Sequence, residues 1–127
     1  MSEFVSFKAE GSFYPNQIIC LQHHDTCLYG EVIQIISQKE QCWFRPLFLV
    51  IDSERSPDET EQKFIRLNNT SDLLWPLCLF RYSLDTEVIP LLSKLSDFDS
   101  FPVDELLSRQ YLHQFIKQVW QANQDKF

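Results

Sequence analysis

YGEVIQIISQKEQCWFRPLFLVI, residues 29–51, is the stretch that decides the fold class. It contains two runs rich in β-branched and aromatic residues, 29–37 and 41–51, separated by the polar tripeptide 38–40. Runs of this composition favour strands, and a polar connection of this length is typical of a hairpin. Pro46 cannot donate a hydrogen bond to a strand ladder, so it is expected at an edge, a bulge or a bend. The stretch therefore predicts an antiparallel β-hairpin.

Three shorter apolar runs predict three more strands, at 17–22, 63–67 and 77–83. Residues 52–62 include five acids and no apolar side chain, so a solvated loop is expected there. One tight helical turn is expected near 71–75. This order of elements predicts a mainly β fold with added helices, a small SH3-like five-stranded barrel followed by C-terminal helices. The alternative is an α+β fold in which helices pack on one face of an antiparallel sheet.

The chain after the last predicted strand is expected to be helical, starting with residues 84–95. Asp85 or Thr86 can cap such a helix. Pro90 would then lie inside it and remove a backbone hydrogen bond. The other possibility is that the helix starts at Pro90 and that the residues before it are extended.

The clearest helical pattern lies in residues 101–124. At 100° per residue, Leu106 and Phe115 point to opposite sides of one continuous helix. Either the helix 102–122 breaks near Ser108, which we favour, or it is buried on two sides. Two-sided burial would need a partner, and a homodimer formed through this helix is one possibility.

The chain of 127 residues is expected to form a single domain, 1–127. Within it we expect an N-terminal arm over 1–16, the small barrel over 17–83 and a C-terminal helical segment over 84–127. No internal repeat is visible.

The composition argues against several classes of function. The net charge is −7 and the basic residues are scattered, which disfavours nucleic acid as a partner, because its binding depends on contacts from lysine and arginine to phosphate. With only Gly11 and Gly30, the chain has no glycine-rich phosphate loop. The longest apolar run, 73–80, is too short to cross a membrane, and no secretory signal is visible. A cytoplasmic protein without membrane association is therefore expected.

The segment CLQHHDTC, residues 20–27, contains four residues of the types that bind metals: Cys20, His23, His24 and Cys27. A zinc site usually combines two such pairs from distant parts of the chain, and no second pair follows here. We therefore interpret the segment as a turn between two strands and expect no metal site. A weak metal-binding or redox role of Cys20–Cys27 is kept as an alternative.

Two arginines interrupt apolar strands and need either a charged partner or access to water. Arg45 and Arg81 could pair with one of four acids: Glu31, Asp72, Asp85 or Glu87. Together with nearby aromatic residues they have the composition of interaction hot spots. The candidate partner-binding residues are Trp43, Arg45, Trp75, Arg81, Tyr82 and Trp120.

The segment DLLWPLCLFRYSLDTEVIPLL (72–92), with LYGEVIQII (28–36) and CWFRPLFLV (42–50) before it, resembles a family of small cyanobacterial proteins of unknown function. The resemblance implies a cytoplasmic setting and no particular activity. No catalytic motif is present and no cofactor is expected. We therefore expect a non-enzymatic protein-interaction or assembly module, with a regulatory RNA- or DNA-binding barrel as the alternative.

Overall fold

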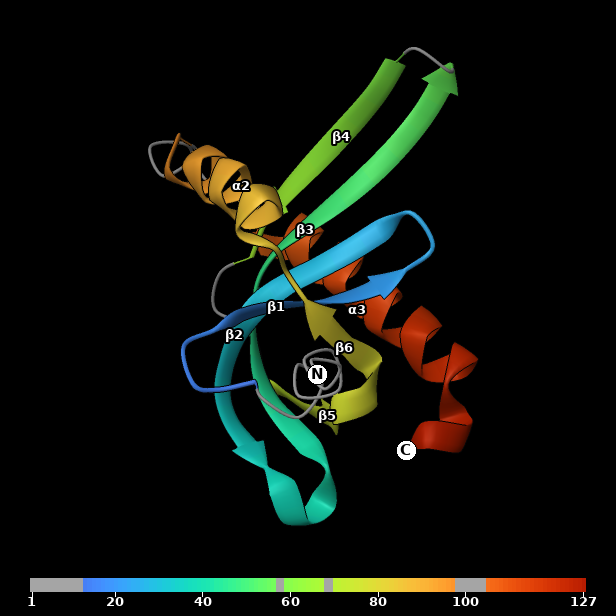
Figure 1. Cartoon of the computed structure of the whole chain (residues 1–127). Coiled ribbons are helices and arrows are strands. Elements are labelled where there is room, and N and C mark those ends of the chain that lie inside the picture. The colour runs from blue at the N-terminus through green and yellow to red at the C-terminus, as the bar shows by residue number, and fades with distance from the viewer. Residues whose placement is uncertain (1–12, 57–58, 68–69, 98–104) are drawn as a thin grey trace, which may run out of the picture.

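The computed structural model describes residues 13–56, 59–67, 70–97 and 105–127. Strands form most of the first two thirds of the chain and helices the last third (Figure 1). In chain order the elements are β1 (Ile18–His23), β2 (Thr26–Ile36), the 3₁₀ helix η1 (Ser37–Lys39), β3 (Gln41–Ser56), β4 (Glu59–Arg66), β5 (Leu73–Pro76), the 3₁₀ helix η2 (Leu77–Leu79), β6 (Phe80–Tyr82), α2 (Asp85–Asp97), α3 (Glu105–Ala122) and the 3₁₀ helix η4 (Gln124–Lys126).

The predicted hairpin is confirmed, because β2 and β3 pair antiparallel and are joined by η1. Glu40 ends this connection in the left-handed conformation, with a φ of 52°. Pro46 pairs with Gly30 next to a shift in register, so the bulge expected for the proline is also confirmed. An added Cβ at Gly30 would lie 2.4 Å from the carbonyl oxygen of Arg45 and 2.4 Å from Cζ of Phe44. Only glycine allows the two strands to approach this closely.

The prediction of a solvated loop at residues 52–62 is wrong. β3 continues to Ser56 and β4 begins at Glu59, so both arms of the segment are paired strands around 57–58, which lie outside the described residues. The prediction relied on the absence of apolar side chains. However, backbone hydrogen bonds to a neighbouring strand do not require an apolar face, and polar residues suit a ribbon that extends beyond the core. Figure 1 shows this hairpin projecting away from the rest of the sheet.

The prediction of a helical turn near 71–75 is also wrong. Residues 73–76 form β5, which pairs with the start of β3, and the helical turn follows as η2. The residue before a proline is pushed towards extended backbone, and Trp75 precedes Pro76. The predicted strand 77–83 is therefore reduced to β6.

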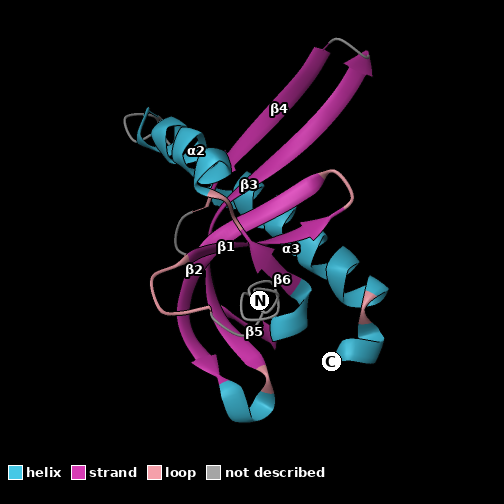
Figure 2. Cartoon of the chain, in the orientation of Figure 1, coloured by secondary structure: helices cyan, strands magenta, loops and turns pink. Residues whose placement is uncertain are grey.

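The sheet is antiparallel, with strand order β4-β3-β2-β1-β6 and with β5 paired to β3 (Figure 2). The long strand β3 pairs with β5 through its first residues and with β4 through its last. No pairing joins β5 to β6 among the described strands, so the sheet is not closed. The predicted SH3-like five-stranded barrel is therefore wrong, and the alternative α+β class with an antiparallel sheet is confirmed.

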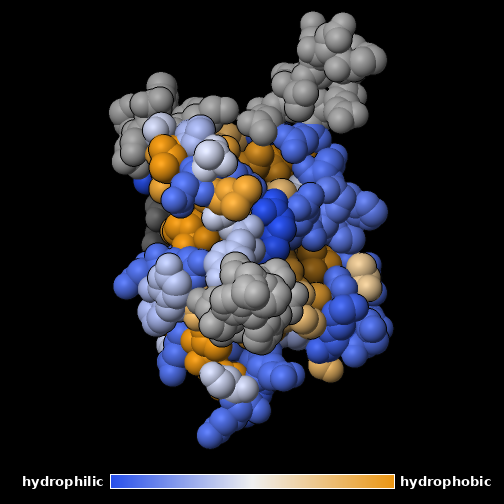
Figure 3. Space-filling view, viewed as in Figure 1, coloured by the Kyte–Doolittle hydropathy of each residue, from blue (hydrophilic) through white to orange (hydrophobic). Residues whose placement is uncertain are grey.

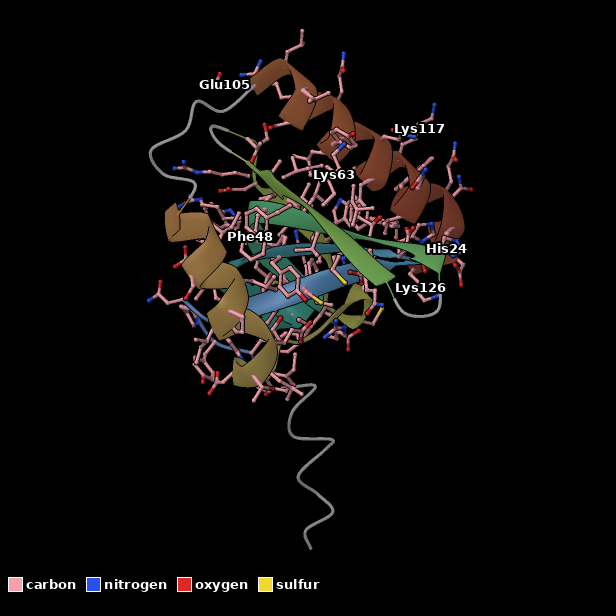
Figure 4. All side chains as sticks on the ribbon, turned by 90° about the horizontal axis from the view of Figure 1, so that it is seen from above. His24, Phe48, Lys63, Glu105, Lys117 and Lys126 are labelled. Carbon is pink, nitrogen blue, oxygen red and sulfur yellow. The ribbon has the colours of Figure 1, made fainter. Side chains whose placement is uncertain are left out.

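The two helices pack against different faces of the sheet (Figure 4). Side chains alternate along a strand, so Ile19 and Leu21 belong to one cluster and Cys20 between them to the other. Leu112 and Phe115 of α3 join the first cluster, whereas Val88 and Leu91 of α2 join the second. The helices thus do not share one face as the alternative expected, and the sheet has a core on both sides.

α2 begins at Asp85 and contains Pro90, so the first of the two predicted starts is confirmed. Pro90 is exposed, which lets its ring face solvent while Val88 and Leu91 on either side are buried. The outer side of α2 carries Ile89, which is 61% exposed. Figure 3 shows apolar residues on the surface in this region.

α3 is continuous from Glu105 to Ala122, so the break favoured near Ser108 is wrong. Ser108 is buried, and its Oγ donates a hydrogen bond to the carbonyl oxygen of Arg66 at 3.0 Å. The apolar residues that seemed to require a second core are simply exposed: Leu106 is 69% and Leu107 46% accessible. Neither this helix nor any other in the described segments is long and apolar enough to cross a membrane.

Candidate functional site

A groove of about 800 Å³ lies between the start of β3, the η2–β6 segment and the C-terminal residues. Its apolar lining comes from distant parts of the sequence: Phe13, Pro76, Leu77, Phe80, Tyr82 and Phe127. This volume is typical of a ligand site, and aromatic lining with a few polar groups is typical of its chemistry. We call this feature the aromatic groove.

Two turns bring Phe13 and the C-terminal residues to the aromatic groove. At the N-terminal side, two hydrogen bonds join Tyr14 and Gln17. The backbone N–H of Gln17 donates to the carbonyl oxygen of Tyr14 at 3.2 Å, and the backbone N–H of Tyr14 donates to Oε1 of Gln17 at 3.1 Å. The turn places Phe13 edge-on to Tyr82, with ring centroids 5.0 Å apart. At the other end, Asn123 caps α3 by donating from Nδ2 to the carbonyl oxygen of Val119 at 2.9 Å.

The chain then turns back through η4, and the ring of Phe127 meets Trp75 edge-on at 5.1 Å. Trp75 is only partly buried and packs against the core from the inward side of β5. The opposite wall is held by a backbone hydrogen bond of 2.8 Å from Leu77 to the carbonyl oxygen of Glu40. The groove is therefore framed by short, hydrogen-bonded segments.

The charged residues of the groove lining are mainly basic. Lys39, Arg81 and Lys126 line it, against the single acid Glu40. Lys39 and Lys126 are exposed, and Lys126 lies 3.6 Å from Asp125 in a solvent-exposed pair that contributes little. In a protein of net charge −7, the lining thus places basic side chains beside an apolar floor, although Arg81 is paired with Glu87 and Lys126 with Asp125.

A second cluster lies on the outward side of β3 and β5. Asp72 accepts hydrogen bonds from Trp43 Nε1 at 2.8 Å and from Arg45 Nε and Nη2 at 3.0 and 3.1 Å. The bonds from Arg45 are the main reason that the pKa of Asp72 is lowered, and the bond from Trp43 adds to them. Leu74 pairs with Trp43 and is 50% exposed. The ion pair expected for Arg45 is thus formed with Asp72, and it holds an exposed tryptophan in place.

Arg81 of β6 has the other predicted ion pair, with Glu87 of α2. Nη2 lies 3.0 Å from one carboxylate oxygen and Nη1 3.3 Å from the other. Tyr29 donates to the same carboxylate from the α2-facing side of the sheet. Burial alone would raise the pKa of Glu87, but the hydrogen bonds from Arg81 and Tyr29 outweigh it and lower the pKa. This cluster fastens α2 to the sheet.

The four candidate metal ligands do not share one face of the sheet. Cys20 and Cys27 lie in the cluster beneath α2, whereas the ring of His23 is 6.5 Å from Phe115 of α3. His24 is in the turn between β1 and β2, with a φ of 54°, near the end of α3 (Figure 4). No three histidine, cysteine or acidic side chains within the described segments are arranged to hold a metal ion. Their spacing in sequence matched a knuckle, but strand alternation separates them.

The predicted partner-binding residues do not form one surface. Trp43 and Arg45 are together, Arg81 and Tyr82 are in the aromatic groove, and Trp120 is 46% exposed on α3. Phe13 and the C-terminal residues of the groove were missed, because no local pattern in the sequence indicates that they line the same groove.

Comparison with known proteins provides no further identification: no family model, no curated protein and no solved structure matches this chain.

Proposed function

We propose that the protein is a non-enzymatic interaction module that binds an extended acidic segment of a partner protein in the aromatic groove. The observation that carries the proposal is the combination of an apolar floor with basic walls in a molecule that is otherwise acidic. An apolar side chain of the partner would fill the space between Phe80 and Phe127. Its acidic neighbours would lie beside Lys39 and Lys126.

The chemistry of this lining favours a peptide over nucleic acid and over a second copy of the chain. Nucleic acid would have to approach a surface of net charge −7, which its phosphates disfavour. A second copy of the chain would offer exposed apolar residues with polar residues between them. On α3, for example, Leu106 and Trp120 lie near opposite ends of the outward side, separated by the exposed residues Gln110, His113 and Lys117.

The experiment uses two synthetic peptides of the same length, one alternating glutamate with phenylalanine and one alternating lysine with phenylalanine. Each is titrated into ¹⁵N-labelled full-length protein while amide chemical shifts are followed. We expect the acidic peptide to shift the amides of groove residues such as Leu77 and Tyr82, with an affinity in the micromolar range or weaker. Equal binding of the two peptides, or shifts centred on Trp43 or Trp120, would reject the groove as the binding site. Sedimentation at the same concentrations separates peptide binding from self-association.

A further inference from the structure

Two thiols lie next to each other beneath α2. Cys20 is on β1 and Cys27 on β2, where they are diagonal neighbours, since Cys20 pairs with Tyr29 and Cys27 with Gln22. Both belong to the cluster that Val88 of α2 covers. Neither cysteine lines the aromatic groove. Arg81 is the residue that links the two places, because it lines the groove and also contacts Cys27.

The environments of the two thiols differ. Cys20 is completely buried, whereas Cys27 keeps 9% of its surface accessible. Nη2 of Arg81 lies 3.9 Å from Sγ of Cys27, and the Arg81 side chain is itself 42% exposed. Part of Cys27 therefore remains at the surface beside a permanent positive charge, whereas Cys20 has no accessible surface.

The same contacts determine which thiol ionises first. The hydrogen bond from Cys20 lowers the pKa of Cys27, burial opposes this, and the Arg81 guanidinium lowers the pKa further. Conversely, the hydrogen bond to Cys27 and complete burial raise the pKa of Cys20. Since the thiolate is the nucleophile, these shifts favour Cys27 over Cys20 as the nucleophile of the pair.

We propose that Cys27 is a peroxide-reactive thiol and that Cys20 resolves it to an intramolecular disulfide. The Cys27 thiolate attacks one oxygen of a hydroperoxide, so that an S–O bond forms and the O–O bond breaks. The departing oxygen takes a proton from water and leaves as an alcohol, or as water when the oxidant is hydrogen peroxide. The sulfur of Cys20 then attacks the sulfur of the sulfenic acid. An S–S bond forms, the S–O bond breaks, and hydroxide leaves with the Cys20 proton as water.

Closing this disulfide changes the contacts of α2. Diagonal neighbours on paired strands are about 7–8 Å apart at Cα, which is slightly more than a disulfide usually spans. β1 and β2 must therefore shift towards each other at this point. The reaction also removes the negative charge of the Cys27 thiolate beside Arg81. Arg81 keeps its ion pair with the carboxylate of Glu87 on α2. Oxidation is thus expected to be reversible by a dithiol and to alter the packing of α2.

Peptide mapping tests the proposal on the full-length protein. Reduced protein is treated with hydrogen peroxide at pH 7, alkylated and digested with trypsin. Cleavage after Lys8 and Lys39 yields one peptide that contains Cys20 and Cys27, whereas Cys42 and Cys78 fall in two other peptides. We expect the first peptide to lose two hydrogens and to take up no alkyl group. Buried Cys42, whose pKa burial raises to about 11, provides the internal comparison and should oxidise on the order of a hundredfold more slowly.

Variants distinguish this reaction from unspecific oxidation. In Cys20→Ala, Cys27 should accumulate as a sulfenic acid that dimedone traps, and in Cys27→Ala, Cys20 should remain a free thiol. Cys78→Ser, which removes an exposed thiol, is the matched control and should leave the reaction unchanged. The proposal is overturned if the wild-type peptide takes up two alkyl groups after peroxide treatment. It is equally overturned if Cys27 oxidises no faster than Cys42. Circular dichroism tests whether each variant is folded. If a variant does not fold, the peptide mapping of the wild-type protein alone decides whether the disulfide forms.

Discussion

Replacing Gly30 by alanine is the substitution whose effect on stability follows most directly from the structure. The new Cβ would lie 2.4 Å from the backbone oxygen of Arg45, and 2.4 and 2.7 Å from two ring carbons of Phe44. Real Cβ atoms essentially never lie this close to other heavy atoms. Phe44 is fully buried, so its ring cannot turn away into solvent, and the oxygen belongs to the paired strand β3. The two strands must therefore separate locally.

Overpacking of this kind costs roughly 1–3 kcal/mol. For a chain of 127 residues, that cost corresponds to a fall in Tm of roughly 4–11 °C. Calorimetry and urea unfolding of Gly30→Ala measure both quantities. Gln34→Ala, on the exposed side of the same strand, is the control and should stay within about 0.5 kcal/mol of wild type.

A second substitution separates steric overlap from any other cause. Phe44→Leu removes the ring carbons but leaves the backbone oxygen of Arg45 in place. The double variant Gly30→Ala/Phe44→Leu should therefore be more stable than the sum of the two single effects predicts, by at least about 0.5 kcal/mol. If Gly30→Ala unfolds at the wild-type temperature, the steric explanation is refuted. If the two effects simply add, the overlap with the Phe44 ring is refuted as part of it.

Three further predictions follow from the packing and the hydrogen bonds. Phe115→Ala should lower the free energy of unfolding by roughly 3–5 kcal/mol, whereas Leu106→Ala on the exposed side of the same helix should change it by less than about 0.5 kcal/mol in urea titrations. Asp72→Asn should lower Tm at pH 7 and shift the emission of Trp43; because the pKa of Asp72 is lowered in the fold, the difference from wild type should disappear as the pH falls below about 4. Burial and the hydrogen bond to the Glu87 carboxylate raise the pKa of Tyr29, so above about pH 10 the unfolded chain releases a proton that the folded chain keeps. Wild-type stability should therefore fall with pH in that range, and Tyr29→Phe should fall less steeply.

Local patterns predicted the central hairpin, the bulge at Pro46 and the helix that contains Pro90. Each depends on residues close in sequence and on the geometry of one or two strands. The same reasoning failed at residues 52–62, because it required an apolar face, whereas the ribbon is held by backbone hydrogen bonds between two polar strands. It failed near Ser108 because it assumed that every apolar residue of a helix is buried, and Leu106 is not.

The candidate sites show a similar limit. The pairing of Arg45 with Asp72 and of Arg81 with Glu87 could be anticipated, because a charge inside an apolar strand needs a partner. The aromatic groove could not, since it is assembled by Phe13 and by a C-terminal turn that meet only in three dimensions. The alternation of a strand also explains why Cys20 and Cys27 share one side of the sheet while His23 lies on the other.

The most direct test of the proposed function is an exchange of charge across the aromatic groove. In the double variant Lys39→Glu/Lys126→Glu both basic side chains become acidic at exposed positions, so the fold should be retained. Fluorescence polarisation then compares the acidic and the basic phenylalanine peptides on wild type, on this variant and on Lys117→Glu, which replaces one lysine by glutamate outside the groove. We predict that wild type and Lys117→Glu prefer the acidic peptide, and that the double variant prefers the basic one. If all three proteins have the same preference, the groove does not recognise an acidic segment.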